Sequence, residues 1–217
     1  MPIEVQFGIL IVLTYFVGSI PFGLLVAKTK GCDPRQFGSG NIGATNVGRM
    51  LGGKFFAIVF SLDLLKGMVP MLIGAWLIRS YPVTEKPYLW WMLVGLAALL
   101  GHIFPVYLKF KGGKGVATAT GVLLGLFPYY TIPGLIVMGI FIVIFLIWRM
   151  VSLGSMVCAL AFTPVYMLVG YAWGWPVTRQ QLPLLIFAVV MSLLILWKHR
   201  SNFKRILAGT EHVFRKT

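Results

Sequence analysis

Long apolar segments separated by short polar ones make up most of the chain. We predict seven membrane-spanning helices, at residues 5–27, 55–78, 88–101, 116–130, 132–148, 151–171 and 181–197. Several of these are at or below the ~20 residues that a helix needs to cross the hydrocarbon core, so their bounds are approximate. The pattern therefore predicts an all-α fold, a polytopic membrane helix bundle of about seven transmembrane helices, with residues 1–217 in a single domain.

Composition agrees with a membrane protein. Of the 217 residues 59% are hydrophobic and 11% are charged, which is not the balance of a soluble domain. The net charge of +14 would suggest nucleic acid binding in a soluble chain, but here membrane topology explains it and we expect no nucleic acid partner. Cys32 and Cys158 give no disulfide framework. The first apolar segment is long enough to span and follows Glu4, so we expect no cleaved signal peptide.

The positions of the cations predict the orientation. Of the 19 Lys and Arg, 15 lie in the tail or in the loops after the first, third and fifth spans, and three lie in the other loops. Positive residues mark cytoplasmic loops. We therefore expect the N-terminus outside, the C-terminus in the cytoplasm, and three polar clusters on the cytoplasmic face of the membrane.

The first polar cluster is the glycine-rich segment 38–54, which contains no acid. Its match to G-x-G-x-x-G at residues 38–43 does not indicate a dinucleotide fold, because no β-strand precedes it. Glycines expose backbone N–H groups, and nearby hydroxyls and cations complete an anion-binding loop. The predicted substrate-contacting residues here are Ser39, Gly40, Asn41, Gly43, Thr45, Asn46 and Arg49.

The second cluster, residues 109–115, reads Lys-Phe-Lys-Gly-Gly-Lys-Gly. It is not a Walker A motif, since Gly115 stands where a Ser or Thr would hold magnesium. We predict a phosphate-binding loop at a helix N-terminus, formed by Lys111, Gly112, Gly113, Lys114 and Gly115. For Lys109 we favour an anchor to anionic lipid.

The third polar cluster is His-Arg-Ser-Asn-Phe-Lys-Arg at residues 199–205. His199 and Asn202 are three residues apart, and on a helix they would share a face and could position a hydroxyl or stabilise an oxyanion. His102 ends the third span, where a cap is the ordinary role. Asp63 and Lys66 are costly in lipid unless paired, so we predict a structural ion pair. No cluster of acids, His or Cys predicts a metal site.

Three segments together resemble the motifs of the bacterial acyl phosphate:glycerol-3-phosphate acyltransferase family. They are Ser-Gly-Asn-Ile-Gly-Ala-Thr-Asn at 39–46 with Arg49; Gly-His-Ile-Phe-Pro-Val at 101–106, running into Phe-Lys-Gly-Gly-Lys-Gly-Val-Ala-Thr at 110–118; and His199, Asn202, Gly209 and Glu211. Asp-Leu-Leu-Lys-Gly at 63–67 also fits. The resemblance covers essentially the whole chain.

The resemblance implies transfer of an acyl group from acyl phosphate to the sn-1 hydroxyl of glycerol 3-phosphate, giving lysophosphatidate and phosphate. It implies that Ser39, Arg49, His199 and Asn202 serve catalysis, that the 112–115 loop and His102 help to bind substrate, and that Glu211 is structural. We expect no metal and no cofactor. The expected partners are glycerol 3-phosphate, acyl phosphate and membrane lipid, and a monomer is our working hypothesis.

Two other functions were weighed against this one. An acyltransferase that uses acyl-CoA or acyl-carrier protein is expected to contain His-x-x-x-x-Asp, and no histidine here is followed by that pattern. A transporter of a phosphorylated small molecule remains the alternative, although it would place broken helices near mid-membrane. Acyl phosphate is a mixed anhydride, so positioning and electrostatics can supply much of the rate. The proton acceptor is either His199 or a substrate phosphate oxygen.

Overall fold

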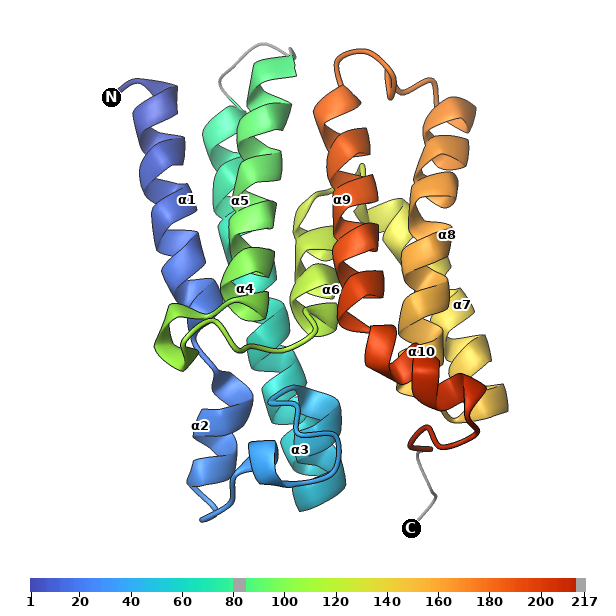
Figure 1. Cartoon of the computed structure of the whole chain (residues 1–217). Coiled ribbons are helices and arrows are strands. Elements are labelled where there is room, and N and C mark those ends of the chain that lie inside the picture. The colour runs from blue at the N-terminus through green and yellow to red at the C-terminus, as the bar shows by residue number, and fades with distance from the viewer. Residues whose placement is uncertain (80–84, 214–217) are drawn as a thin grey trace. The chain divides into compact units, whose positions relative to one another are not determined.

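The computed structural model describes residues 1–79 and 85–213, and these residues form helices joined by loops. The chain divides into two compact units, residues 1–82 with 90–126, and residues 83–89 with 127–217. Figure 1 gives the order of the elements. The first unit contains α1 Ile3–Ser19, α2 Phe22–Lys28, η1 Pro34–Gln36, α3 Ala44–Leu51, α4 Gly53–Ile78, most of α5 Glu85–Ile103, η2 Val106–Leu108 and α6 Val116–Gly125. The second contains α7 Thr131–Trp148, α8 Val151–Ala172, α9 Leu182–Lys198 and α10 Arg200–Leu207.

Five helical segments among the described residues are long and apolar enough to cross a membrane, at Ile3–Lys28, Gly53–Ile78, Lys86–Leu108, Thr131–Trp148 and Val151–Ala172. A sixth is added if α9 and α10, which meet at a bend of 54°, count as one span. The all-helical, multi-pass prediction is therefore confirmed. The count of seven is not established. Of the predicted loop 79–87, residues 80–84 lie outside the described residues.

The predicted fourth span is shorter than expected. Helix α6 ends at Gly125, whereas the apolar pattern placed its end near Tyr130. Pro128 lies in the missing part, and a proline both lacks an N–H donor and disfavours helix in the residue before it. With 10 residues, α6 is about 15 Å long, roughly half the thickness of the hydrocarbon core.

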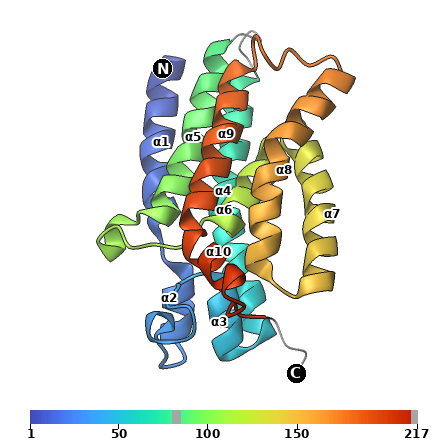
Figure 2. The ribbon, with the colours of Figure 1, turned by 45° about the vertical axis from the view of Figure 1, so that its right-hand side comes forward.

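The first span is interrupted. Helix α1 ends at Ser19 and α2 begins at Phe22, with Ile20 and Pro21 between them. Pro21 cannot donate to the helical ladder, which explains the break. In both ribbon views α1 lies beside α5 (Figure 2), and this approach is close. A Cβ at Gly101 of α5 would lie 2.5 Å from the carbonyl oxygen of Tyr15 on α1.

Glycines also let α4 and α6 pack backbone to backbone. A Cβ at Gly121 would collide with the carbonyl oxygen of Leu64, and a Cβ at Gly67 would collide with that of Thr118. Gly125 lies against Met71 in the same way, since its Cβ would be 2.5 Å from the Cβ of Met71. The contact of Gly67 with Thr118 lies in the first turn of α6, so it holds the N-terminal end of the helix, next to the loop that precedes it.

Two short helices lie where the sequence analysis placed a loop and a tail. Helix α3, at Ala44–Leu51, forms inside the glycine-rich segment, and α10 forms in the basic tail. In α3 the residues Val47 and Ala44 are buried with Val59 of α4. Tertiary burial of this apolar face therefore stabilises a helix that glycine content argued against.

The second unit has an aromatic core around Tyr130. Its ring contacts Phe162 and Tyr166 of α8 and Phe187 of α9, and its hydroxyl donates to the Leu184 carbonyl.

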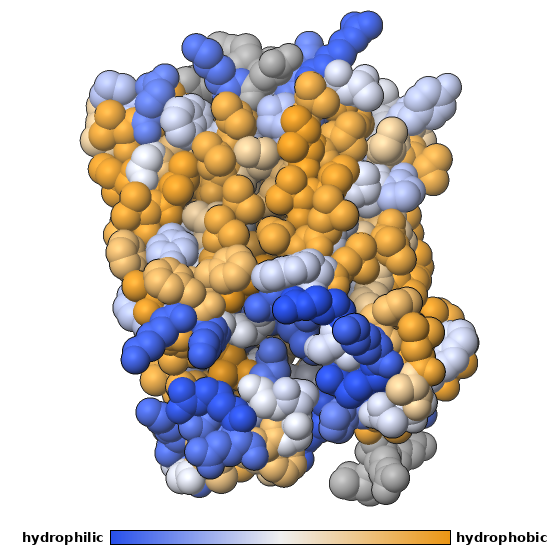
Figure 3. Space-filling model, in the orientation of Figure 1, coloured by the Kyte–Doolittle hydropathy of each residue, from blue (hydrophilic) through white to orange (hydrophobic). Residues whose placement is uncertain are grey.

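The surface agrees with a membrane environment. Hydrophobic residues cover the long helices in Figure 3, while hydrophilic residues gather over the region of α2 and η1 in one unit and over α10 in the other.

Candidate active site

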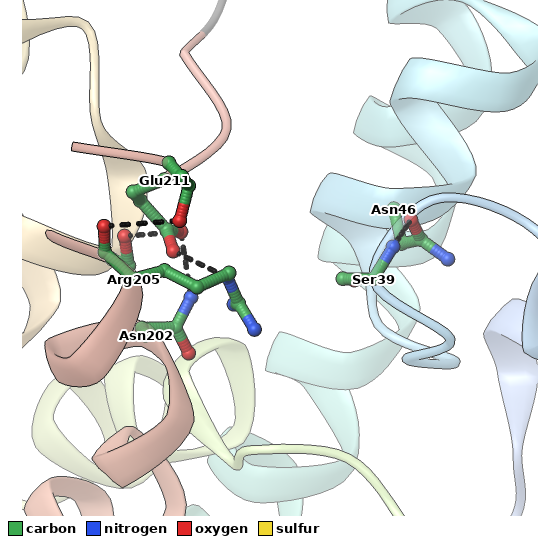
Figure 4. Close-up of polar contacts among 7 residues, drawn as sticks. Ser39, Asn46, Asn202, Arg205 and Glu211 are labelled. Carbon is green, nitrogen blue, oxygen red and sulfur yellow. Dashed lines mark hydrogen bonds and ion pairs between the residues drawn. The ribbon is translucent and has the colours of Figure 1, made fainter. Parts of the chain in front are cut away.

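The first glycine-rich loop is held by the buried side chain of Asn46. Its amide nitrogen donates to the carbonyl oxygens of Pro34, Phe37 and Asn41, at 2.8, 3.0 and 2.9 Å. Its amide oxygen accepts the backbone N–H of Ser39 at 3.1 Å, as Figure 4 shows. Since the whole carboxamide is used in this way and the residue is 2% exposed, the structure gives Asn46 the role of shaping the loop. Its predicted contact with substrate stays a prediction.

The other predicted residues of this loop surround that support. Gly40 has a positive φ of 67°, and its N–H donates to the Phe37 carbonyl at 2.9 Å, which closes a tight turn next to Ser39. Asn41 accepts the N–H of Gly43, the N-cap of α3, at 2.8 Å. Ser39, Thr45 and Arg49 are all half-buried, with Arg49 in the last turn of α3. The side chains that could meet an anion therefore stand on a loop with a fixed backbone.

The second loop folds back on the end of α5. The N–H of Gly113 donates to the carbonyl of His102 at 3.1 Å, and that of Gly112 donates to the carbonyl of Ile103 at 3.3 Å. These bonds satisfy carbonyls that the helix end leaves without partners. The two amides therefore cap α5, and the predicted contact of Gly112 and Gly113 with substrate stays a prediction. Lys109, with φ 49°, is exposed and follows η2.

The features of this loop that suit an anion lie just after Gly112 and Gly113. Lys114 is half-buried and Lys111 is exposed. Gly115 is the N-cap of α6 with a positive φ of 83°, and the first turn of a helix presents N–H groups that its own ladder does not use. The helix dipole also favours negative charge at that end. The loop thus keeps an anion-binding character through Lys114 and the start of α6.

The predicted ion pair inside α4 is confirmed. Lys66 Nζ lies 2.7 Å from Asp63 Oδ1. His102 was not expected beside it, yet its Nδ1 lies 3.6 Å from the same carboxylate oxygen. These three residues line a small pocket together with Ser19, Ile20, Pro21, Ile42 and Pro105. Ile42 belongs to the first loop and Pro105 leads toward the second, so this pocket lies between the two loops of the first unit.

His199 sits at the junction of α9 and α10 and is 2% exposed. Its Nδ1 lies 2.8 Å from the Ile195 carbonyl oxygen. A carbonyl can only accept, so Nδ1 carries the proton in this contact, and the neutral ring then has Nε2 as its unprotonated nitrogen. This is the tautomer that a general base requires at Nε2.

Asn202, in the first turn of α10, belongs to a network centred on Glu211. Asn202 Nδ2 and Ser152 Oγ donate to Glu211 Oε1 at 2.7 and 2.8 Å, and Arg205 Nε donates to Oε2 at 2.8 Å (Figure 4). Burial by itself would raise the pKa of Glu211, but these hydrogen bonds and the charge of Arg205 bring it below its ordinary value. The carboxylate fixes α10 against α8, which is the structural role that the resemblance implies.

The predicted residues therefore fall into two groups. His102, the first loop and the second loop belong to the first unit, while His199 and Asn202 belong to the second. Sequence reasoning missed two supports of Asn202. Arg205 lies in the basic tail, where its partner could not be identified, and Ser152 lies in an apolar span with no motif around it. Within residues 1–79 and 85–213, no group of three or more His, Cys, Asp or Glu could hold a metal ion.

Comparison with known proteins gives one consistent result. Residues 8–209 match the family model described as glycerol-3-phosphate acyltransferase. A glycerol-3-phosphate acyltransferase of Aquifex aeolicus is 42% identical over 209 residues, covering 94% of this chain and 97% of that protein. One of Geobacter metallireducens is 47% identical over 201 residues, covering 93% and 94%.

The solved structures agree with these relatives. The glycerol 3-phosphate form of PlsY (YgiH), described as an integral membrane glycerol 3-phosphate acyltransferase, superposes with a TM-score of 0.82 at 40% identity. It covers 97% of this chain and 96% of that one. The lysophosphatidic acid form of the same protein gives a TM-score of 0.80, again at 40% identity and with the same coverage. The matches extend over nearly the full length of both chains, as the resemblance of the three motifs implies.

Proposed function

This chain belongs to the glycerol-3-phosphate acyltransferase family and acylates glycerol 3-phosphate to lysophosphatidate, and we propose that it takes the acyl group from an acyl phosphate. The observation that carries the reaction is the match over residues 8–209, which includes the three motifs up to Gly209. The acyl phosphate donor rests on the resemblance of those motifs. In this reaction the bond between the acyl carbon and the phosphate oxygen breaks, an ester forms at the sn-1 oxygen, and inorganic phosphate leaves.

We propose that the two loops of the first unit bind the phosphates. Arg49 presents a planar guanidinium suited to a phosphate from the last turn of α3, and Ser39 adds a hydroxyl from the loop. Lys114 adds charge at the start of α6. Asn46, Gly112 and Gly113 support these groups through the hydrogen bonds described above. Six further contacts with substrate stay predictions, those of Gly40, Asn41, Gly43, Thr45, Lys111 and Gly115.

The second unit supplies the proposed base. His199 Nε2 would accept the proton of the sn-1 hydroxyl as that oxygen attacks the acyl carbon, and the Ile195 carbonyl keeps the ring in the required tautomer. Asn202 would hold an oxygen whose charge grows in the transition state, with its carboxamide oriented by Glu211. We propose that residues 1–217 form a single domain, which the one family match over residues 8–209 supports.

We first predict the donor and the metal requirement. Purified protein given labelled glycerol 3-phosphate should form lysophosphatidate from palmitoyl phosphate and none from palmitoyl-CoA. It should keep its activity in EDTA, because an acyl phosphate already carries a good leaving group. Product from palmitoyl-CoA at a comparable rate would reverse the donor assignment. Strong inhibition by EDTA, restored by a divalent ion, would overturn the metal-free mechanism.

We also propose an orientation in the inner membrane. The chain crosses seven times, with α6 and the residues that follow it as the short fourth crossing, the N-terminus outside and the C-terminus in the cytoplasm. The support is the charge distribution, with 15 of 19 cations in the tail and in the loops assigned to the cytoplasm. Both substrate-binding loops and α10 then face the cytoplasm.

This orientation predicts a labelling pattern. In a chain with Cys32 and Cys158 replaced by serine, cysteines at Ser39 and at Ser201, an exposed residue of α10, should react with a membrane-impermeant thiol reagent only from the cytoplasmic side. A cysteine at the exposed Gln180, in the loop between α8 and α9, should react only from outside. Glycerol 3-phosphate should protect the cysteine at position 39 and neither of the other two. Labelling with the opposite sidedness would reverse the topology.

A further inference from the structure

Asp63 and Lys66 are buried ionisable residues with no role in the chemistry described so far. Their side chains are each 3% exposed, inside a helix that crosses the membrane. Removing two charges from water is expensive, and apolar residues of similar size often fill such positions at no loss of stability. The pair therefore calls for an explanation other than stability, and its contacts on either side supply one.

On one side the pair holds the break in the first span. Lys66 Nζ donates to the Ile20 carbonyl oxygen at 2.9 Å, at the point where Pro21 interrupts the helix. On the other side, Asp63 Oδ1 lies 3.6 Å from His102 Nδ1. His102 is itself 6% exposed. One carboxylate thus connects α4 to the last turn of α5, and through Lys66 to the junction of α1 and α2.

His102 in turn touches the second loop twice. Its carbonyl accepts the N–H of Gly113 at 3.1 Å, and Gly113 lies directly against the imidazole, since a Cβ there would collide with Nε2 and approach Cε1 to 2.9 Å. A carboxylate 3.6 Å from Nδ1 attracts a proton on that nitrogen, which favours the tautomer with the proton on Nδ1 and the ring orientation that turns it toward Asp63. The ring plane sets the position of Gly113, and Lys114 is the next residue.

We propose that Asp63 is a positioning residue for the glycerol 3-phosphate loop, acting through the imidazole of His102. The proposal rests on the proposed function of Lys114 in binding glycerol 3-phosphate. Asp63 orients the ring, the ring supports Gly113, and Lys114 is thereby held where it meets the phosphate. Lys66 balances the charge of Asp63 and ties this support to the α1–α2 break.

The test is a double-mutant cycle read in the KM for glycerol 3-phosphate. Asp63→Asn combined with Lys66→Met removes both charges and leaves no unpaired ion in the membrane. His102→Gln removes the ring while leaving the ion pair intact. Each change should raise the KM for glycerol 3-phosphate about tenfold, in line with the loss of one buried polar contact, with little effect on the KM for the acyl donor. Ser61→Ala, at an exposed position of the same helix, is the control and should change neither.

The triple variant tests whether Asp63 acts through His102. If Asp63 acts through His102, adding His102→Gln to the neutral pair should raise this KM by less than about twofold further, because contacting residues are not additive. If the two fold-increases in the KM for glycerol 3-phosphate multiply fully in the triple variant, the proposal is overturned. A wild-type KM in His102→Gln alone would overturn it as well. If the neutral pair cannot be purified, Asp63→Asn alone takes its place in the cycle.

Lys114→Ala, measured in parallel, separates this inference from the proposed function. An unchanged KM for glycerol 3-phosphate in Lys114→Ala would show that the loop does not bind this substrate, and the proposed function of the loop would fail. A raised KM in Lys114→Ala together with full multiplication in the cycle would leave the loop assignment standing and reject only the positioning role of Asp63.

Discussion

A protein with His199 replaced by alanine is expected to fold and to lose at least about a hundredfold in kcat, the loss typical of removing a general base. His199 is buried at the α9–α10 junction, and its Nδ1 contact with the Ile195 carbonyl leaves Nε2 as the nitrogen that can take a proton. The measurement is steady-state kinetics with both substrates saturating, together with a thermal unfolding scan of the purified variant.

Two companion variants make this result interpretable. His199→Gln keeps a side chain in the space and should lose as much activity as the alanine variant, since an amide is no base. Ser201→Ala, at an exposed position in α10, should retain wild-type activity. A loss below about tenfold in both His199 variants would assign proton removal to a phosphate oxygen of the substrate, because a general base contributes more than that.

Replacing Lys114 or Arg49 by alanine is expected to lower kcat/KM for glycerol 3-phosphate by an order of magnitude or more. Charge-assisted hydrogen bonds to a phosphate contribute ~2 kcal/mol or above. Both side chains are half-buried and held on supported backbone, at the start of α6 and in the last turn of α3. Lys109→Ala should lose little, because Lys109 is exposed and we assign it to lipid contact.

The comparison among the variants of Lys114, Arg49 and Lys109 distinguishes specific contacts from general electrostatics. Equal, modest losses at Lys114, Arg49 and Lys109, all reduced by added salt, would mean that the cations act only through the general electrostatics of the membrane surface. A selective loss at Lys114 and Arg49 requires specific contacts. The way in which each loss of kcat/KM divides between KM and kcat then reports whether the contact forms with the bound substrate or only in the transition state.

The long helices could be predicted because their signal is a simple one. Apolar stretches such as 132–148 and 151–171 lie within α7 and α8 and need no partner to be recognised. The ion pair of Asp63 and Lys66 was predictable for the same reason, since two opposite charges three residues apart in a span have few alternatives. Local sequence is sufficient in both cases.

Other features depend on contacts between residues that are far apart in the sequence. Helix α3 forms within a glycine-rich segment because Val47 packs in one buried cluster with Val59 of α4. The amides of Gly112 and Gly113 cap α5, a contact that forms only when the chain folds back on the end of that helix. The link between Asp63 and His102 joins residues on different helices. The spacing of these residues along the sequence predicts none of these contacts.

The buried carboxamide of Asn46 has a consequence for the thermodynamics of substrate binding. Ordering a loop costs roughly 1–2 kcal/mol per residue in backbone conformational entropy, and a ligand as small as glycerol 3-phosphate has few atoms with which to offset it. Because Asn46 already binds the carbonyls of Pro34, Phe37 and Asn41, that entropy is lost when the chain folds. The free energy of each phosphate contact is then available for affinity and for the transition state.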